Sequence, residues 1–260
     1  MLAFALLAVC GCRSIPALVA TDLLSLSRRI VTNRTDVIQR IIDKKKAKTY
    51  LEIGVANGTN FFPIRVRQKI AVDPNFTFSK KHRIKWTLKN LYNVVAKYYE
   101  STSDSYFSRK KSTDRLDVVF IDGLHTYEQS LRDVINSLIN LNETGVIIMH
   151  DCSPPNQAAA HPAASVKHAT ELELPGWTGE WSGDVWKTIC YLRSHRTDLR
   201  VFVLDCDYGL GIVTKGEADS CLNLSQSELN EMTYEDLVSD RRNLLNLKDE
   251  SYLFEFLENI

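Results

Sequence analysis

Two apolar runs of the sequence end in acidic and imidazole side chains. The run LDVVFI leads into Asp122, with His125 three residues further on, and the run GVIIM leads into His150 and Asp151. In open parallel sheets, ligands bind beyond the carboxyl ends of the strands. Carboxylates and imidazoles can there bind a divalent cation or move a proton. The sequence therefore predicts a site where these strands end.

A glycine-containing turn follows an earlier apolar run, TYLEI. Gly54 and Gly58 bracket this turn, and Asn57 tolerates the left-handed conformation that such turns use. The spacing E-x-G-x-x-x-G differs from the dinucleotide pattern G-x-G-x-x-G, and the glycines alone would also fit a turn that serves packing only. The next run, KIAVD, ends in Asp73 about 20 residues on, where an acid can accept both hydroxyls of a ribose. The two features together predict a nucleoside site.

The elements that position these residues alternate between strand and helix. Apolar strand runs separated by helical patterns predict an α/β fold with a parallel sheet covered on both faces. Thr126 and Gln129 have the spacing of a capping box, and a helical stripe follows it: Leu131, Val134, Ile135, Leu138 and Ile139. The late runs LRVFVLDCD and YGLGIVTKG predict a hairpin, so that the last strand of the sheet is antiparallel.

The chain divides into three parts and one long insertion. Residues 1–32 are an appendage, either a signal-like or anchoring segment, a soluble helix or a non-native start; the apolar stretch is too short for a stable membrane span. Residues 33–216 hold the regular pattern, and 217–260 predict a helical extension. Residues 152–184 form a long irregular stretch with two tryptophans, which favours a lid or substrate loop.

The composition argues against several classes of protein. The 260 residues carry no net charge and have a pI near 7.0, so no nucleic-acid partner is expected. The six cysteines form no paired CxxC motifs, so no zinc site is expected. Unpaired cysteines favour a reducing compartment, and we expect a cytoplasmic protein, with export or anchoring left open by the apolar N-terminus.

Five motifs in order resemble the class I S-adenosylmethionine-dependent methyltransferases. They read YLEIGVANGTNF, KIAVDPNF, DVVFIDGLHTYEQSLRDV, GVIIMHDC and GDVWKTICYLR. The nearest resemblance is to the bacterial branch with the FIDGLHTYE motif, which is methyltransferase domain 24-like. It covers residues 33–216 and implies a Rossmann-like, doubly wound, seven-stranded sheet that is mostly parallel, with the last strand antiparallel.

The resemblance implies roles for individual residues. The cofactor would be S-adenosylmethionine, and Asp73 would hold its ribose hydroxyls. Ser103 and Asp104 would lie near its adenine. The remaining positions implied to bind the cofactor are Glu52, Gly54, Asn57, Gly58 and Asp122.

The same resemblance raises the question of a metal ion. Catechol-type members place a metal between an Asp after the fourth strand and an Asp-Asn pair after the fifth, with a catalytic lysine three residues after the first Asp. Here Asp122, His150 and Asp151 would bind Mg²⁺ or Mn²⁺, and His125 stands in the lysine's place as a base beside Asp122. In the alternative, both acids cap helices and bind the cofactor amine, and the two histidines only support them.

These observations favour O-methylation of a small polar acceptor, such as a sugar or secondary metabolite, with or without a metal. The rivals are a metal-independent N- or O-methyltransferase and a non-catalytic protein that binds the cofactor as a scaffold. A nicotinamide-dependent oxidoreductase is disfavoured by the missing G-x-G-x-x-G turn, and a serine hydrolase by the missing G-x-S-x-G turn. The sequence leaves the oligomeric state open.

Overall fold

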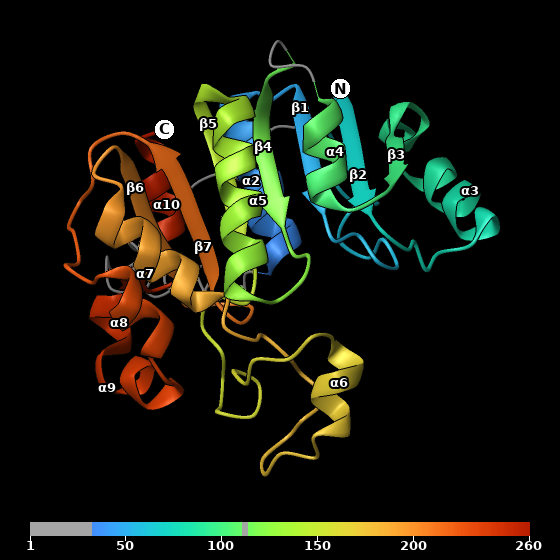
Figure 1. Ribbon diagram of the computed structural model, residues 1–260. Helices are drawn as coiled ribbons and strands as arrows, with labels where there is room; N and C mark the ends of the chain where they lie inside the picture. The colour runs from blue at the N-terminus through green and yellow to red at the C-terminus, as the bar shows by residue number, and fades with distance from the viewer. Residues whose placement is uncertain (1–32, 111–113) are drawn as a thin grey trace, which may run out of the picture. The chain divides into compact units, whose positions relative to one another are not determined.

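The computed structural model describes residues 33–110 and 114–260 (Figure 1). The expectations for residues 1–32 lie outside these residues. The unit from Thr32 to Ile260 is a single body, and only this unit is described below. None of the described helices has the length and hydropathy that crossing a membrane requires.

The centre of the unit is an eight-stranded sheet with the order β3-β2-β1-β4-β5-β7-β6-β8. Strands β1 to β5 are parallel, and β7 is antiparallel to both of its neighbours, β5 and β6. The strands are β1 (Thr49–Ile53), β2 (Gln68–Asp73), β3 (Lys97–Glu100), β4 (Leu116–Ile121), β5 (Leu141–Met149), β6 (Leu199–Leu204), β7 (Leu210–Lys215) and β8 (Leu247–Lys248). This confirms the predicted Rossmann-like α/β class and the antiparallel last strand of the domain.

The eighth strand was not predicted. β8 is two residues long and pairs in parallel with the end of β6, through Leu247 beside Val203 and Lys248 beside Leu204. It lies inside residues 217–260, for which the sequence predicted only helices. A two-residue strand is too short to produce an alternating pattern, so nothing in the sequence marks it.

Helices cover both faces of the sheet, as Figure 1 shows. One hydrophobic cluster joins α4, α5, α7, α8 and α9 to strand residues such as Leu51, Val119 and Ile147. The other joins α2 and α10 to the alternate residues Tyr50, Val118 and Ile148. The helices are α2 (Arg34–Lys45), α3 (Lys80–Lys89), the 3₁₀ helix η1 (Leu91–Val95), α4 (Ser103–Arg109), α5 (Tyr127–Asn140), α6 (Val166–Glu171), α7 (Trp186–His195), α8 (Gln226–Glu231), α9 (Tyr234–Leu244) and α10 (Tyr252–Glu258).

Helix α5 begins where it was predicted but differs in two details. The Thr126 side chain accepts from the Gln129 amide, whereas the Gln129 side chain donates to Ser103 and Asp133 instead of closing a capping box. The predicted apolar stripe is displaced, because Ile139 is exposed and Asp133 is buried. A polar side chain on the buried face therefore points to a functional surface on this helix.

The long insertion 152–184 is anchored at the carboxyl-end edge of the sheet. It carries the short helix α6 and a small cluster of its own, formed by Ala163, Ala169 and Trp181 with Trp177 against it. Its last residues return to the ends of β4 and β5. The Ser182 hydroxyl donates to the Asp151 carboxylate after β5, and a Cβ at Gly183 would lie 1.9 Å from the carbonyl oxygen of His125 after β4. Its role as a lid stays a prediction.

Candidate functional site

A cavity of about 390 Å³ lies at the carboxyl ends of β1, β2 and β4. Gly54 and Ala56 contribute to it from the turn after β1, and Asp73 from the end of β2. Asp122 contributes to it from the end of β4. Its remaining polar walls come from residues 101–103 at the start of α4 and from Gln129 and Asp133 of α5. A volume of this order is typical of a small-molecule site.

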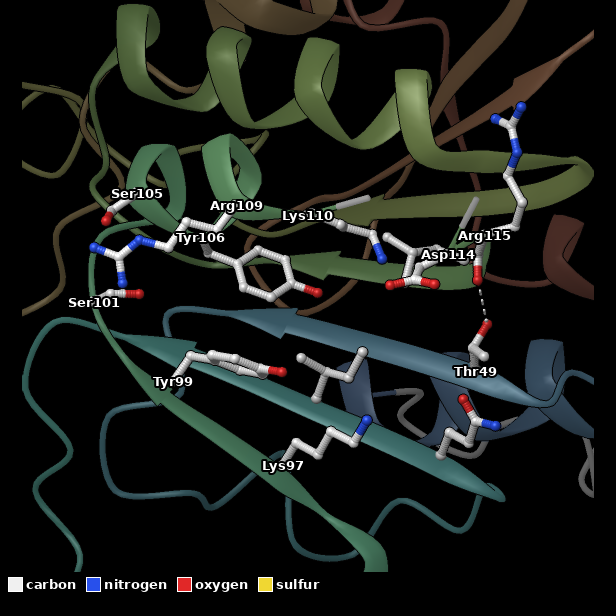
Figure 2. Close-up of a pocket in the computed structure, with 13 residues that line it drawn as sticks. Thr49, Lys97, Tyr99, Ser101, Ser105, Tyr106, Arg109, Lys110, Asp114 and Arg115 are labelled. Atoms are coloured by element: carbon white, nitrogen blue, oxygen red, sulfur yellow. Dashed lines mark hydrogen bonds between the residues drawn. The ribbon is translucent and has the colours of Figure 1, made fainter. Parts of the chain in front are cut away.

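A larger cavity, about 590 Å³, lies elsewhere on the unit and shares only Ser101 with the first (Figure 2). It is lined by the amino-terminal residues of strands, including Thr49 of β1, and by basic side chains such as Lys97, Arg109 and Lys110. In Figure 2, Tyr106 of α4 faces Tyr99 of β3, and the two rings are in edge-to-face contact, with centroids 5.1 Å apart. None of the predicted site residues lines this cavity, so its greater size does not make it the candidate site.

Asp73 occupies the position predicted for it. Its Oδ2 accepts the Ala56 amide at 2.8 Å, and its Oδ1 accepts the Asn75 amide at 2.7 Å. These two backbone bonds fix the carboxylate in the wall of the cavity, and each oxygen keeps a further lone pair for a ligand. The residue can therefore accept two hydroxyl groups, as a ribose presents them.

The three predicted residues of the glycine turn differ in their relation to the cavity. Gly54 has a φ of +82°, and a Cβ there would lie 1.8 Å from the Asp122 carbonyl oxygen. Gly58 also has a positive φ, but its neighbour is the Phe62 ring, and Asn57 accepts from the Thr59 amide within the turn. Of these three predicted residues, only Gly54 lines the cavity.

Glu52 does not line the cavity, contrary to the role implied for it. Side chains alternate along a strand, so Glu52 lies on the face opposite to Ile53, which does line the cavity. There it accepts the Tyr50 hydroxyl at 2.5 Å and the Asn60 amide at 2.9 Å. Burial raises the pKa of this carboxyl to about 8, although the Tyr50 hydrogen bond lowers it.

The region predicted for adenine holds Ser103 but not Asp104. Ser103 lines the cavity, and its hydroxyl accepts from Gln129 at 3.2 Å. Asp104 faces outward, with its side chain 48% exposed and 3.6 Å from Arg132. Sequence analysis missed Gln129 and Asp133, which line the cavity from α5; burial raises the pKa of Asp133 to about 6. Asp133 lies outside the apolar stripe that the sequence predicts for this helix, so the sequence pattern gave no signal for it.

The acids and imidazoles predicted at the ends of β4 and β5 do converge. His125 Nε2 lies 3.2 Å from Asp122 Oδ1 and 3.4 Å from Asp151 Oδ2. His150 Nδ1 lies 2.7 Å from Asp151 Oδ2 and 3.3 Å from Asp122 Oδ1. Asp122 also lines the cavity, so this cluster borders the place where a cofactor would bind.

The second nitrogen of His125 defines its tautomer. Nδ1 lies 2.6 Å from the Trp181 carbonyl oxygen, which can only accept, so Nδ1 carries a proton and Nε2 is the atom that gains or loses one. Burial lowers the pKa of His125, but Asp122 and Asp151 outweigh it and raise the pKa to about 9. Burial would raise the pKa of Asp122, yet the two imidazoles hold it well below its usual range.

Two further members of the cluster were missed by sequence analysis. Arg34, the first residue of α2, donates from Nη1 to Asp122 Oδ2 at 2.9 Å. Its Nε and Nη2 donate to both oxygens of Asp207, each at 2.9 Å. Asp207 stands in the turn between β6 and β7 and lies 3.5 Å from His150 Nε2. No local pattern marks either residue, because 173 positions separate them.

The cluster has the donor types of a metal site but does not fit a divalent ion as it stands. One atom from each of Asp122, His125 and Asp151 lies within 4.8 Å of the others, whereas the predicted set had His150 in place of His125. The Arg34 guanidinium, however, binds Asp122 Oδ2, and Ser182 and His150 bind the two oxygens of Asp151. A metal ion would have to displace these partners.

Comparison with known proteins identifies a domain. Residues 51–152 match the family model described as a methyltransferase domain, which confirms the resemblance. No curated protein matches the sequence at a significant level.

Three solved structures with a similar fold are distant in sequence. Cofactor-bound Rv0187 from MTB is 12% identical, with a TM-score of 0.51, over 78% of this chain and 91% of that one. The SAH-bound methyltransferase PaMTH1 of Podospora anserina is 14% identical, with a TM-score of 0.49, over 78% and 89%. The O-methyltransferase TomG of Streptomyces achromogenes, in complex with SAM, is 10% identical, with a TM-score of 0.48, over 76% and 96%. At such identities the likeness to Rv0187 shows the fold alone.

Proposed function

We propose, from the match of residues 51–152 to a methyltransferase-domain model, that the chain transfers the methyl group of S-adenosylmethionine to an oxygen of a small polar acceptor. One observation carries this proposal: the Asp73 carboxylate is held by two backbone amides in the wall of a cavity at the carboxyl ends of the parallel strands. This is where an open α/β sheet binds a nucleoside.

The cavity walls suit the different parts of the cofactor. Asp73 would accept the ribose hydroxyls, and Gly54 lets the ligand approach the backbone closely. Ser103, Gln129 and Asp133 offer hydroxyl, amide and carboxyl groups on the side where an adenine would lie. Asp122 borders both the cavity and the acid–imidazole cluster, so the reactive end of the cofactor would face that cluster.

When bound, S-adenosylmethionine supplies an electrophilic methyl group on a sulfonium. As the acceptor oxygen bonds to the methyl carbon and the carbon–sulfur bond breaks, the acceptor hydroxyl must lose its proton. His125 Nε2 is the proposed recipient, and the Trp181 carbonyl and the two acids hold its ring in place. Because its pKa is about 9, only a minor fraction of His125 is neutral at pH 7, and turnover should rise with pH.

The insertion 152–184 is proposed to cover the acceptor. Trp181, Ser182 and Gly183 contact His125 or Asp151 in succession, so closure of this segment would shield the reacting groups from water. Alignment and exclusion of water are the main contributions that the protein makes to a methyl transfer of this kind.

Methyl transfer can be tested directly. The protein is incubated with methyl-labelled S-adenosylmethionine and a panel of sugars, phenols and other small hydroxyl compounds, and label in the product is counted. Transfer to at least one acceptor, lost in the Asp73→Ala variant, is expected. Tight cofactor binding without transfer to any hydroxyl acceptor would favour a non-catalytic scaffold and contradict the proposal.

A further inference from the structure

Arg34 brings a cation into contact with two members of the acid–imidazole cluster, Asp122 and His150. Its guanidinium forms a bidentate pair with Asp207 and places Nη1 2.9 Å from Asp122 Oδ2 and 3.3 Å from His150 Nδ1. Its backbone amide also donates to Asp207, at 2.7 Å. The guanidinium is charged at every accessible pH, so these contacts place a permanent cation among the acids.

The guanidinium is held rigidly. The side chain of Arg34 is 26% exposed, and those of Asp122 and Asp207 are 18% and 15% exposed, so both ion pairs are shielded from water. Planar bidentate pairing of Arg with a carboxylate is a strong and directional contact. In addition, Arg34 begins helix α2, whose Val37, Ile38 and Ile41 are fully buried, so the backbone that carries the guanidinium is fixed by the core.

The remaining oxygens of the two acids at the strand ends are also taken. Asp122 Oδ1 faces His125 and His150, Asp151 Oδ2 faces the same two rings, and Asp151 Oδ1 accepts from the Ser182 hydroxyl. A divalent ion would have to break at least one of these bonds and would also meet the charge of Arg34 at short range. Such repulsion between like charges is large in a shielded site.

We propose that Arg34 is the resident cation of this site and excludes Mg²⁺ and Mn²⁺ from the triad of Asp122, His125 and Asp151. Arg34 is a positioning residue: it holds the Asp122 carboxylate, which in turn contacts His125. The statement about metal binding stands on the contacts alone. Only its consequence, a methyl transfer that needs no metal, rests on the proposed function.

The test is a titration with Mn²⁺ in the absence of cofactor and acceptor. Binding is measured by calorimetry and by the loss of the electron paramagnetic resonance signal of free Mn²⁺. The wild-type chain should bind no Mn²⁺ at the site. The Arg34→Met variant should bind one ion, at least about tenfold more tightly than any binding detectable in wild type, because Asp122 then loses its contact with the permanent cation. The gain should disappear in Arg34→Met combined with Asp151→Asn.

A structural disturbance alone does not create a metal site, which makes a gain of binding diagnostic. Arg40→Met is the matched control: Arg40 lies on the same helix, with its guanidinium over the Phe254 ring, outside the cluster. If Arg34→Met does not fold, Arg34→Gln, which keeps hydrogen-bonding groups without the charge, replaces it.

Two results would overturn the proposal. One is stoichiometric Mn²⁺ binding by the wild-type chain that Asp122→Asn abolishes. The other is a folded Arg34→Met variant, judged by near-ultraviolet circular dichroism, that binds no Mn²⁺. Both are read without turnover, so a failure to transfer methyl groups would leave this inference intact. Where transfer is observed, it should survive EDTA.

Discussion

Gly54 and the carbonyl oxygen of Asp122 approach so closely that a Cβ at residue 54 would lie 1.8 Å from that oxygen. The contact joins the end of β1 to the end of β4. Both ends line the cavity, and Asp122 at the end of β4 also belongs to the acid–imidazole cluster. Since the obstacle is backbone, it cannot move aside by a change of rotamer. The alignment of the two halves of the site therefore depends on the absence of a side chain at position 54.

Gly54→Ala should consequently lower stability and abolish cofactor binding. Gly176→Ala is the matched control, because Gly176 has a φ of +79°, close to the +82° of Gly54, but nothing lies within 4 Å of its Cβ position. Positive φ alone should cost Gly176→Ala about 1 kcal/mol, and the clash should add several kcal/mol at Gly54. Chemical denaturation measures both. Equal losses in the two variants would show that the contact has no role.

Asp73→Asn should weaken binding of S-adenosylmethionine by about 10- to 100-fold, since the amide keeps its shape but loses one acceptor and the charge. Isothermal titration calorimetry gives the affinity. The control is Asp104→Asn, which removes an acid from the neighbouring turn outside the cavity. Unchanged affinity in Asp73→Asn would remove the ribose assignment, and a loss in Asp104→Asn would restore the role first implied for that residue.

The strand-end acids were predictable because apolar runs locate strands, and parallel strands end at one edge. Asp73, Asp122 and Asp151 all lie there, as expected. Glu52 was misplaced for a physical reason: both faces of this sheet are covered, so Leu51 and Ile53 are buried like Tyr50. Without an exposed face, a buried strand gives no sign of which side an acid occupies.

Long-range charge pairs set the limit of sequence reasoning. In the sequence, Arg34 has the pattern of an ordinary polar residue at the start of a helix. Asp207 has the pattern of an ordinary turn residue in a hairpin. Only the topology, which brings the start of α2 to the β6–β7 turn, makes them partners. Whether the cluster holds a metal or an internal cation therefore depends on a contact that no local pattern encodes.

Ionisation of Asp133 should make cofactor binding depend on pH. Its pKa is raised to about 6 by burial, and its carboxylate accepts from Gln129 at 3.0 Å in the cavity wall. If the ionised carboxylate accepts from the cofactor, affinity should fall as the pH drops through 6. Calorimetry at pH 5, 6 and 7.5 tests this, and Asp133→Asn should make the profile flat. A profile that is already flat in the wild-type chain would exclude Asp133 from recognition.

Both the stability of the fold and the turnover should depend on the proton at His125 Nε2. Its folded pKa of about 9 exceeds the ordinary value of 6.5, so the stability that it contributes is complete below pH 6.5 and is lost as the pH rises through 9. The shift corresponds to on the order of 3 kcal/mol. Glu52 and Lys69 also titrate near this range, so the quantity to compare is the difference in unfolding free energy between wild type and His125→Gln at pH 6, 7.5 and 9.5.

That difference should shrink as the pH rises, whereas His161→Gln, at an exposed position of the insertion, should leave the profile unchanged.

The same proton must leave before Nε2 can accept one from the acceptor hydroxyl, so wild-type turnover should increase up to about pH 9. His125→Gln should lower turnover at every pH while cofactor affinity stays near wild type, because His125 does not line the cofactor cavity. Turnover that survives this substitution would place the base elsewhere, and a constant stability difference would show that the two acids do not hold the proton on His125.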